Sequence, residues 1–232
     1  AMEKYGTDKP DLRFDLEIKP ITSLVKDCGF SVFADIVKKG GVVHALKAGG
    51  GAKFTRKEID ELTETAKAKG AKGLAYIILK DDGEPASPII KFLGDELTRK
   101  IIKIVGGEAG DMIFFGADEW RTVCHALGAV RNECARKLGL KDNAKAAWCW
   151  ITDFPMFEKD EASGKLNAMH HPFTSAKDIA DLDHPETALA KAYDVALNGS
   201  EIAGGSIRIH DSKLQKKTFD IMGISDEDAE RR

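Results

Sequence analysis

The chain has 232 residues, of which 43% are hydrophobic and 31% charged, and its formal net charge is −3. This length is enough for one large or two small domains with buried cores, and the apolar fraction excludes a disordered chain. Apolar runs are far shorter than the roughly 18 residues of a membrane-spanning helix, and no secretory signal is expected from the charged residues at the start. We therefore expect a soluble, cytoplasmic protein without membrane contact.

The first 21 residues are polar and extended, and within them Phe14, Leu16 and Ile18 alternate with charged residues in a half-buried strand pattern. Residues 22–145 alternate predicted strands and helices. Strands are expected over 29–37, 41–46, 74–79 and 112–115, and a helix over 94–105. A further helix is expected to begin at Thr55, which can form a capping box with Glu58.

Apolar residues from Trp120 to Leu138 recur at steps of three or four, which predicts a long amphipathic helix. It contains Cys124 and Cys134. The four cysteines, which also include Cys28 and Cys149, have no metal-ligand spacing, so we expect buried free thiols. Further along the chain, strands are predicted over 148–154 and 206–210, with a helix over 185–197.

Adjacent histidines, His170 and His171, precede Pro172 in a segment that is expected to be extended. Their side chains would then point to opposite sides, so that one could face a cleft while the other orients it. Two partly exposed loop histidines are the structural alternative. A metal site would need a second ligand cluster, which the sequence does not offer.

A second unusual segment runs from Glu201 through Gly204 and Gly205 to Arg208. On a regular strand Glu201 and Arg208 would face opposite sides, but irregular backbone at the glycine pair could bring them to one site. The carboxylate could then hold Mg²⁺ and the guanidinium could bind a carboxylate with two hydrogen bonds. An ordinary strand with exposed charges is the alternative. The glycines at 49–51 lack the pattern of a phosphate-binding loop and are expected to form a flexible loop.

The chain resembles bacterial-type aspartyl-tRNA synthetase, a class II enzyme, over nearly its whole length. The resemblance is carried by YGTDKPDLRF at 5–14, WITDFPMFE at 150–158, AMHHPFTS at 168–175 and AYDVALNGSEIAGGSIRIHD at 192–211. It implies an α+β (mixed α/β) fold: a GAD-type insertion domain over 22–145, with parts of an antiparallel-sheet catalytic domain at 1–21 and 146–232.

The resemblance also implies the chemistry. The family uses ATP and Mg²⁺ to convert aspartate to aspartyl-adenylate and then transfers the aspartyl group to tRNA. By position, His170 would contact aspartate, His171 would assist it, and Arg208 would hold the aspartate side-chain carboxylate. Glu201 would lie on the ATP side as a Mg²⁺ contact, and Gly204 and Gly205 would line the pocket.

The same resemblance places the anticodon-binding domain and the dimer-forming segment before residue 1, and motif 3 after residue 232. We therefore expect a fragment of a homodimeric enzyme that has no measurable aminoacylation activity alone. A non-catalytic tRNA- or protein-binding module related to the GAD domain of tRNA-dependent amidotransferase remains the alternative. It would explain the middle of the chain but not AMHHPFTS or EIAGGSIRIH.

Overall fold

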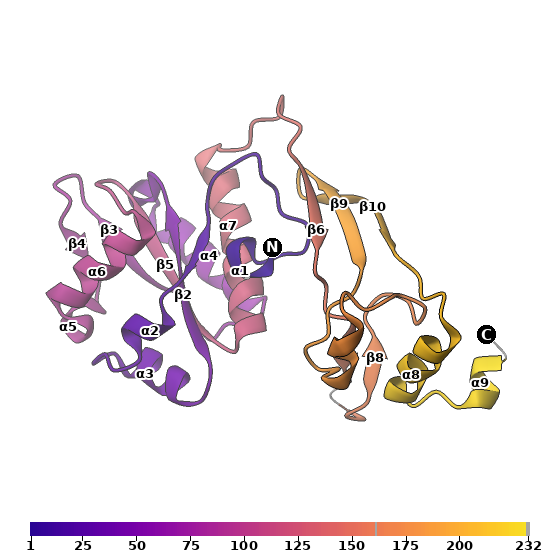
Figure 1. Ribbon diagram of the computed structural model, residues 1–232. Helices are drawn as coiled ribbons and strands as arrows, with labels where there is room; N and C mark the ends of the chain where they lie inside the picture. The colour runs from indigo at the N-terminus through magenta and orange to yellow at the C-terminus, as the bar shows by residue number, and fades with distance from the viewer. Residues whose placement is uncertain (161, 231–232) are drawn as a thin grey trace. The chain divides into compact units, whose positions relative to one another are not determined.

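The computed structural model describes residues 1–160 and 162–230 (Figure 1). The chain divides into two compact units, Ala1–Ala147 and Trp148–Arg232. All strand pairs in both units are antiparallel. The expected α+β class is thereby confirmed. Within the described residues, no helix has both the length and the apolar character needed to cross a bilayer.

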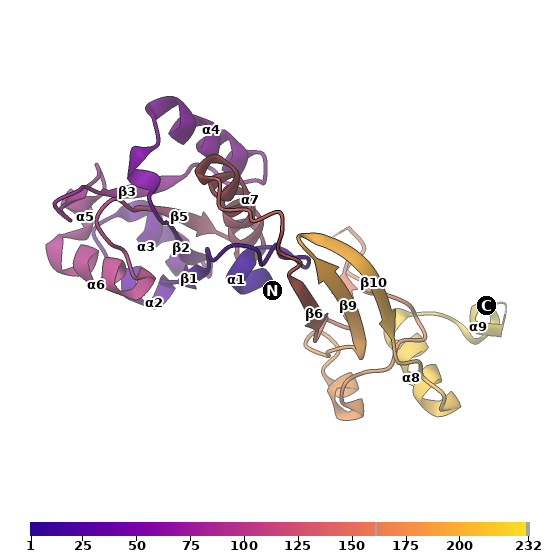
Figure 2. The same cartoon turned by 90° about the horizontal axis from the view of Figure 1, so that it is seen from above.

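The first unit is built on a five-stranded sheet with helices on both faces. Its strand order is β1 (Ile18–Pro20), β2 (Val42–Ala48), β5 (Met112–Asp118), β3 (Ala75–Leu79) and β4 (Pro85–Ala86). One face is covered by α1 (Met2–Tyr5), α4 (Arg56–Lys67) and α7 (Trp120–Leu138), and the other by α2 (Thr22–Val25), α3 (Ser31–Lys38), α5 (Ile90–Leu93) and α6 (Asp95–Val105). Figure 2 shows α4 and α6 on opposite sides of the sheet.

The central strand β5 explains this three-layer arrangement. Met112 and Phe114 pack into the core beneath α4 and α7, whereas Ile113 and Phe115 pack into the core beneath α3 and α6. A strand buried on both faces needs a continuous apolar run, and the sequence supplies one here. The prediction of a strand over 112–115 is confirmed, although the strand extends further, to Asp118.

Helix α4 begins as its sequence predicts. The Thr55 side chain accepts a hydrogen bond from the Glu58 N–H, and the Glu58 carboxylate accepts one from the Thr55 N–H at 2.8 Å. These reciprocal bonds satisfy two donors that the first helical turn would otherwise leave unpaired. A short 3₁₀ turn, η1 (Gly51–Lys53), precedes this start.

The second unit has a three-stranded sheet, a hairpin and helices. The sheet order is β10 (Ser200–Ser206), β9 (Ala192–Leu197) and β6 (Trp148–Thr152). The other elements are the hairpin of β7 (Phe157–Lys159) and β8 (Leu166–Ala168), the 3₁₀ helix η2 (Ile179–Asp183), α8 (Ser212–Met222) and α9 (Asp226–Glu230). The small core includes Met156, Phe157, Leu182 and several alanines.

The strand expected from Phe14 begins only at Ile18, and three further predicted helices and strands are wrong. The strand expected over 29–37 is helix α3, because Phe30, Phe33 and Val37 repeat at helical spacing and turn toward the same core. The helix expected over 185–197 is instead a loop followed by β9; Ala190 and Ala192 are both buried, which is the alternation of extended chain. The strand expected over 206–210 is not formed there; the observed strand β10 comes earlier, over Ser200–Ser206.

Candidate functional site

A pocket of about 300 Å³ in the second unit collects the polar residues of two segments. It is lined by His170, His171, Asp194, Glu201, Gly204, Gly205, Ser206 and Arg208. Six of these residues were predicted from the sequence to belong to a site, whereas Asp194 and Ser206 were not assigned to it. The pocket is shallow, since the side chains of His170, His171, Glu201 and Arg208 are exposed.

The β9–β10 hairpin explains how Glu201 and Arg208 reach the same pocket. Asn198 and Gly199 form its turn with positive φ angles of 52° and 87°, the conformation that tight hairpins need. Glu201 pairs with Ala196, and Ala203 pairs with the next residue of β9, so one residue of β10 is additional. Because of this extra residue, the side chains that follow it in β10 lie on the opposite face of the strand from the one that regular alternation would give.

The position of this irregularity differs from the expectation. It lies between Glu201 and Ala203, not at Gly204 and Gly205, both of which pair regularly with β9. The two glycines serve a different purpose. A Cβ atom on Gly204 would overlap the Asp194 carboxylate, and one on Gly205 would lie 2.9 Å from the Tyr193 hydroxyl oxygen. The missing side chains therefore make room for residues of the neighbouring strand.

The histidine segment is folded into a turn instead of being extended as predicted. The Thr174 N–H donates to the His171 carbonyl at 2.8 Å, and the Phe173 N–H donates to His171 Nδ1 at 3.2 Å. Because the chain turns here, both histidines line the pocket, whereas the prediction placed them on opposite sides. The imidazole of His170 packs against Phe154 at 4.6 Å between ring centroids, in an edge-to-face arrangement.

Backbone hydrogen bonds fasten this histidine turn to the chain that follows β10. The Ser175 N–H donates to the Ile207 carbonyl at 2.9 Å, and the Ile209 N–H donates to the Phe173 carbonyl at 2.8 Å. Thr174 and Arg208 therefore lie opposite one another in an isolated β-bridge. This pairing places the histidines and Arg208, which are far apart in sequence, at the same pocket.

The pocket combines one guanidinium, two imidazoles and two carboxylates. A guanidinium can bind a carboxylate or phosphate through two parallel hydrogen bonds. Carboxylates suit Mg²⁺, which usually takes one or two of them together with substrate phosphates. Asp194 and Glu201 fit that pattern, and no group of three potential metal ligands occurs among the residues described by the structure.

Other candidates from the sequence have structural explanations. The Gly50 N–H donates to Asp111 Oδ1 at 2.9 Å, so the loop at 49–51 is held by a carboxylate of the protein itself.

All four cysteines are free thiols. Cys124 and Cys134 are buried as predicted, and burial raises the pKa of the Cys124 thiol to about 11 and that of Cys134 to about 12. Cys28 and Cys149 are only partly buried, contrary to the prediction.

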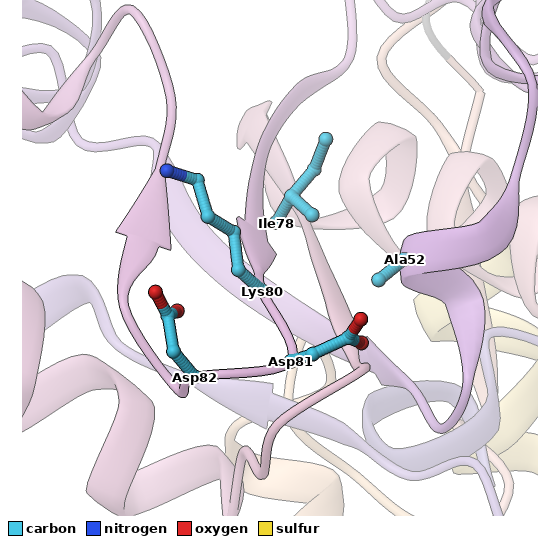
Figure 3. Close-up of a pocket in the computed structure, with 5 residues that line it drawn as sticks. All are labelled: Ala52, Ile78, Lys80, Asp81 and Asp82. Atoms are coloured by element: carbon cyan, nitrogen blue, oxygen red, sulfur yellow. The ribbon is translucent and has the colours of Figure 1, made fainter.

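A larger pocket, of about 480 Å³, lies in the first unit (Figure 3). It is lined by Ala52, Ile78, Lys80, Asp81 and Asp82 around the turn that follows β3. Figure 3 shows Asp81 directed toward Ala52, with Lys80 and Asp82 on the other side of the turn. We assign the functional site to the smaller pocket because its charged groups come from distant segments, whereas the three charged residues here are consecutive.

Comparison with known proteins gives one match within the first unit and others along the whole chain. The GAD domain family matches residues 33–127. The whole chain is 49% identical to the aspartate–tRNA(Asp/Asn) ligase of Persephonella marina, 50% identical to the aspartate–tRNA ligase of Clostridium perfringens and 47% identical to that of Staphylococcus carnosus. It covers 40%, 39% and 40% of these relatives, respectively. The predicted resemblance to aspartyl-tRNA synthetases is thus confirmed along the whole chain, which spans about 40% of the length of these relatives.

Proposed function

We propose that the full-length protein containing this chain is an aspartate–tRNA ligase. It would activate aspartate with ATP to give aspartyl-adenylate and pyrophosphate, and would then transfer the aspartyl group to tRNA. The observation that carries this proposal is the convergence of two histidines, Arg208 and two carboxylates on one pocket, in a chain similar along its length to such ligases.

Arg208 is proposed to hold the side-chain carboxylate of aspartate. Its planar guanidinium can donate two parallel hydrogen bonds to that group, a geometry that lysine cannot reproduce. His170 would contact the same substrate, and His171, whose Nδ1 accepts a hydrogen bond from the Phe173 N–H, would help to orient it. The glycines at 204 and 205 would form part of the pocket wall.

Glu201 is proposed to lie on the ATP side of the pocket. Together with Asp194, it would offer carboxylate oxygens to the Mg²⁺ ion that accompanies the ATP phosphates. When bound, this ion would neutralise part of the phosphate charge. The reaction joins an anionic carboxylate to an anionic phosphate, so its acceleration depends on positioning and on compensating positive charge. Arg208 supplies such a charge from this chain.

The remaining assignments belong to the same proposal. Residues 1–21 and 146–232 would belong to the catalytic domain and residues 22–145 to the insertion domain, although residues 1–21 pack within the first unit. The full-length protein acts as a homodimer in the cytoplasm, with tRNA, aspartate and ATP as its partners. The GAD-related binding module accounts for residues 33–127 but leaves the charged pocket of the second unit without a role.

The test is aspartate-dependent exchange between ATP and pyrophosphate by the full-length protein. We expect Arg208→Leu to lower kcat/KM for aspartate by about 10²-fold or more, because two charge-assisted hydrogen bonds are lost. Arg208→Lys restores the charge without the paired geometry and should recover only part of the activity. Arg99→Leu is the matched control, since Arg99 is an exposed arginine of helix α6 in the other unit.

Two outcomes would contradict the proposal. Unchanged exchange in Arg208→Leu would remove Arg208 from the site, and absence of exchange in the wild type would favour the binding module. The 232-residue chain, assayed alone in the same way, is predicted to show no exchange.

A further inference from the structure

A hydroxyl pair links the two segments that build the pocket. Thr174 Oγ1, beside the histidine turn, lies 3.1 Å from Ser206 Oγ at the end of β10. The two side chains differ in exposure: Thr174 is only 3% exposed, whereas Ser206 is partly exposed and lines the pocket. Thr174 does not line the pocket.

This difference in burial determines the direction of the hydrogen bond. The bond uses one of the two hydroxyl protons. If Ser206 were the donor, the Thr174 proton would remain in a buried position without the acceptor that Ser206 Oγ provides, which is costly. If Thr174 is the donor, the proton left over belongs to Ser206 and is directed to the pocket, where a ligand or water can accept it. The second arrangement is therefore favoured.

Ser206 is also well placed with respect to the guanidinium. Ser206 and Arg208 are two residues apart in extended chain, so their side chains lie on the same face, and both line the pocket. A carboxylate has two oxygens and room for about four hydrogen bonds. Two bonds from Arg208 leave acceptor positions open for a neighbouring hydroxyl.

We propose that Ser206 is a further substrate-binding residue, whose hydroxyl donates to the carboxylate held by Arg208, and that Thr174 is the positioning residue that sets the direction of this hydroxyl. The inference rests on the proposed function. It adds two roles to that function. Ser206 becomes a third hydrogen-bond donor to the substrate carboxylate, and Thr174, a buried residue outside the pocket, orients the Ser206 hydroxyl.

The experiment is a double-mutant cycle in the full-length protein, with Ser206→Ala, Thr174→Val and the combination. Exchange between ATP and pyrophosphate gives KM for aspartate and for ATP separately, and thermal unfolding reports stability. Ser206→Ala is expected to raise KM for aspartate by about 10-fold, as for one lost hydrogen bond to a charged group, with KM for ATP unchanged. Thr174→Val should raise KM for aspartate by a smaller factor, since the Ser206 hydroxyl remains but is no longer oriented.

The double variant separates binding from stability. Ser206→Ala leaves the Thr174 hydroxyl without its acceptor, so the melting temperature should fall; adding Thr174→Val removes that hydroxyl and should recover the melting temperature. KM for aspartate should nevertheless stay as high as in Ser206→Ala, because Thr174 acts only through Ser206. Thr187→Val is the matched control, since the Thr187 hydroxyl donates to the His184 carbonyl in an exposed loop.

Three results would overturn the inference. The first is a KM for aspartate in Ser206→Ala within twofold of wild type. The second is a rise in KM for ATP equal to that for aspartate, which would indicate a structural effect only. The third is a further rise when Thr174→Val is added to Ser206→Ala. Wild-type protein without aspartate-dependent exchange would instead overturn the proposed function, and this inference with it.

Discussion

The two glycines of β10 show how single residues shape the pocket. Gly204 leaves the space that the Asp194 carboxylate occupies, and Gly205 leaves the space beneath the Tyr193 hydroxyl. Register explains both contacts, since Gly204 pairs with Asp194 and Gly205 pairs with Tyr193 across the hairpin. Glycine is therefore required here by neighbouring side chains, and neither position has a positive φ angle.

Gly204→Ala is accordingly expected to displace the Asp194 carboxylate and to lower the free energy of unfolding by about 1–3 kcal/mol, as for an overpacked contact. Asp194→Ala in the same chain should relieve the overlap, so the two changes together should cost less than the sum of the separate changes. Urea titration of the four proteins measures this coupling. Gly73→Ala is the control, because Gly73 has open space around its Cβ position and no positive φ angle. Additive effects of Gly204→Ala and Asp194→Ala would refute the contact.

At the scale of elements, the start of helix α4 is fixed by the capping box that Thr55 and Glu58 form. Both the N–H and the hydroxyl of Thr55 donate to the Glu58 carboxylate, at 2.8 and 2.9 Å, and these bonds lower the pKa of Glu58. Because the pKa is lower in the folded chain, the stabilising contribution is complete above the unfolded pKa and is lost as the pH falls through the folded one.

Thr55→Ala should therefore lower the free energy of unfolding by about 1 kcal/mol near neutral pH, the usual cost of a lost N-terminal cap. Below about pH 4 the cost should be smaller, since protonation of Glu58 weakens the same interaction in the wild type. Urea unfolding followed by circular dichroism at both pH values checks this. Thr65→Ala is the control within the same helix, because the Thr65 hydroxyl donates to the Glu61 carbonyl one turn earlier and not to a carboxylate. A cost independent of pH would exclude a contribution from Glu58.

The elements that the sequence predicted well are those with local signals. The cap of α4, the apolar run of β5 and the stripe of α7 lie within a few residues of the structures they specify. The region 185–197 failed because its alanines suit a helix, while pairing with β6 and β10 makes its second half a strand.

For the site too, the sequence predicts residues in local motifs but not those that long-range pairing brings in. Its histidines, Glu201 and Arg208 stand in recognisable motifs, and the resemblance to a known family drew attention to them. Asp194 and Ser206 enter the pocket through cross-strand register, and Thr174 supports it through a β-bridge between segments more than thirty residues apart. Such neighbours depend on how distant segments pair, which no local pattern in a single sequence specifies.

At the scale of the molecule, the two units differ in how their sheets are covered. The five-stranded sheet of the first unit has a buried core on each face. The three-stranded sheet of the second unit is more open, with Trp148 58% and Trp150 66% exposed. We infer that burial of apolar surface stabilises the first unit more strongly than the second.

The N-terminal segment is integrated into the first unit by one buried arginine. Arg131 of α7 is fully buried and donates to the carbonyls of Leu16, Asp11 and Phe14 at 2.7, 2.9 and 3.1 Å. Its guanidinium also lies 4.1 Å from the centre of the Phe14 ring, and burial lowers its pKa to about 10. Gly128 of the same helix packs directly on the backbone of Gly6, with no room for a side chain.

Arg131→Met should therefore release residues 1–16 from α7. Three carbonyl groups would lose their donor at once, and each buried acceptor left without a donor typically costs about 1–3 kcal/mol. Hydrogen exchange measured by mass spectrometry should show loss of protection in residues 1–20 and in α7, with β6, β9 and β10 unchanged. Arg136→Met is the matched control, because Arg136 is on the same helix but exposed and paired with Glu133. If protection at residues 1–20 survives in Arg131→Met, the segment is held mainly by the packing of Gly6 on Gly128 and of Phe14 in the core, and the role given to Arg131 is wrong.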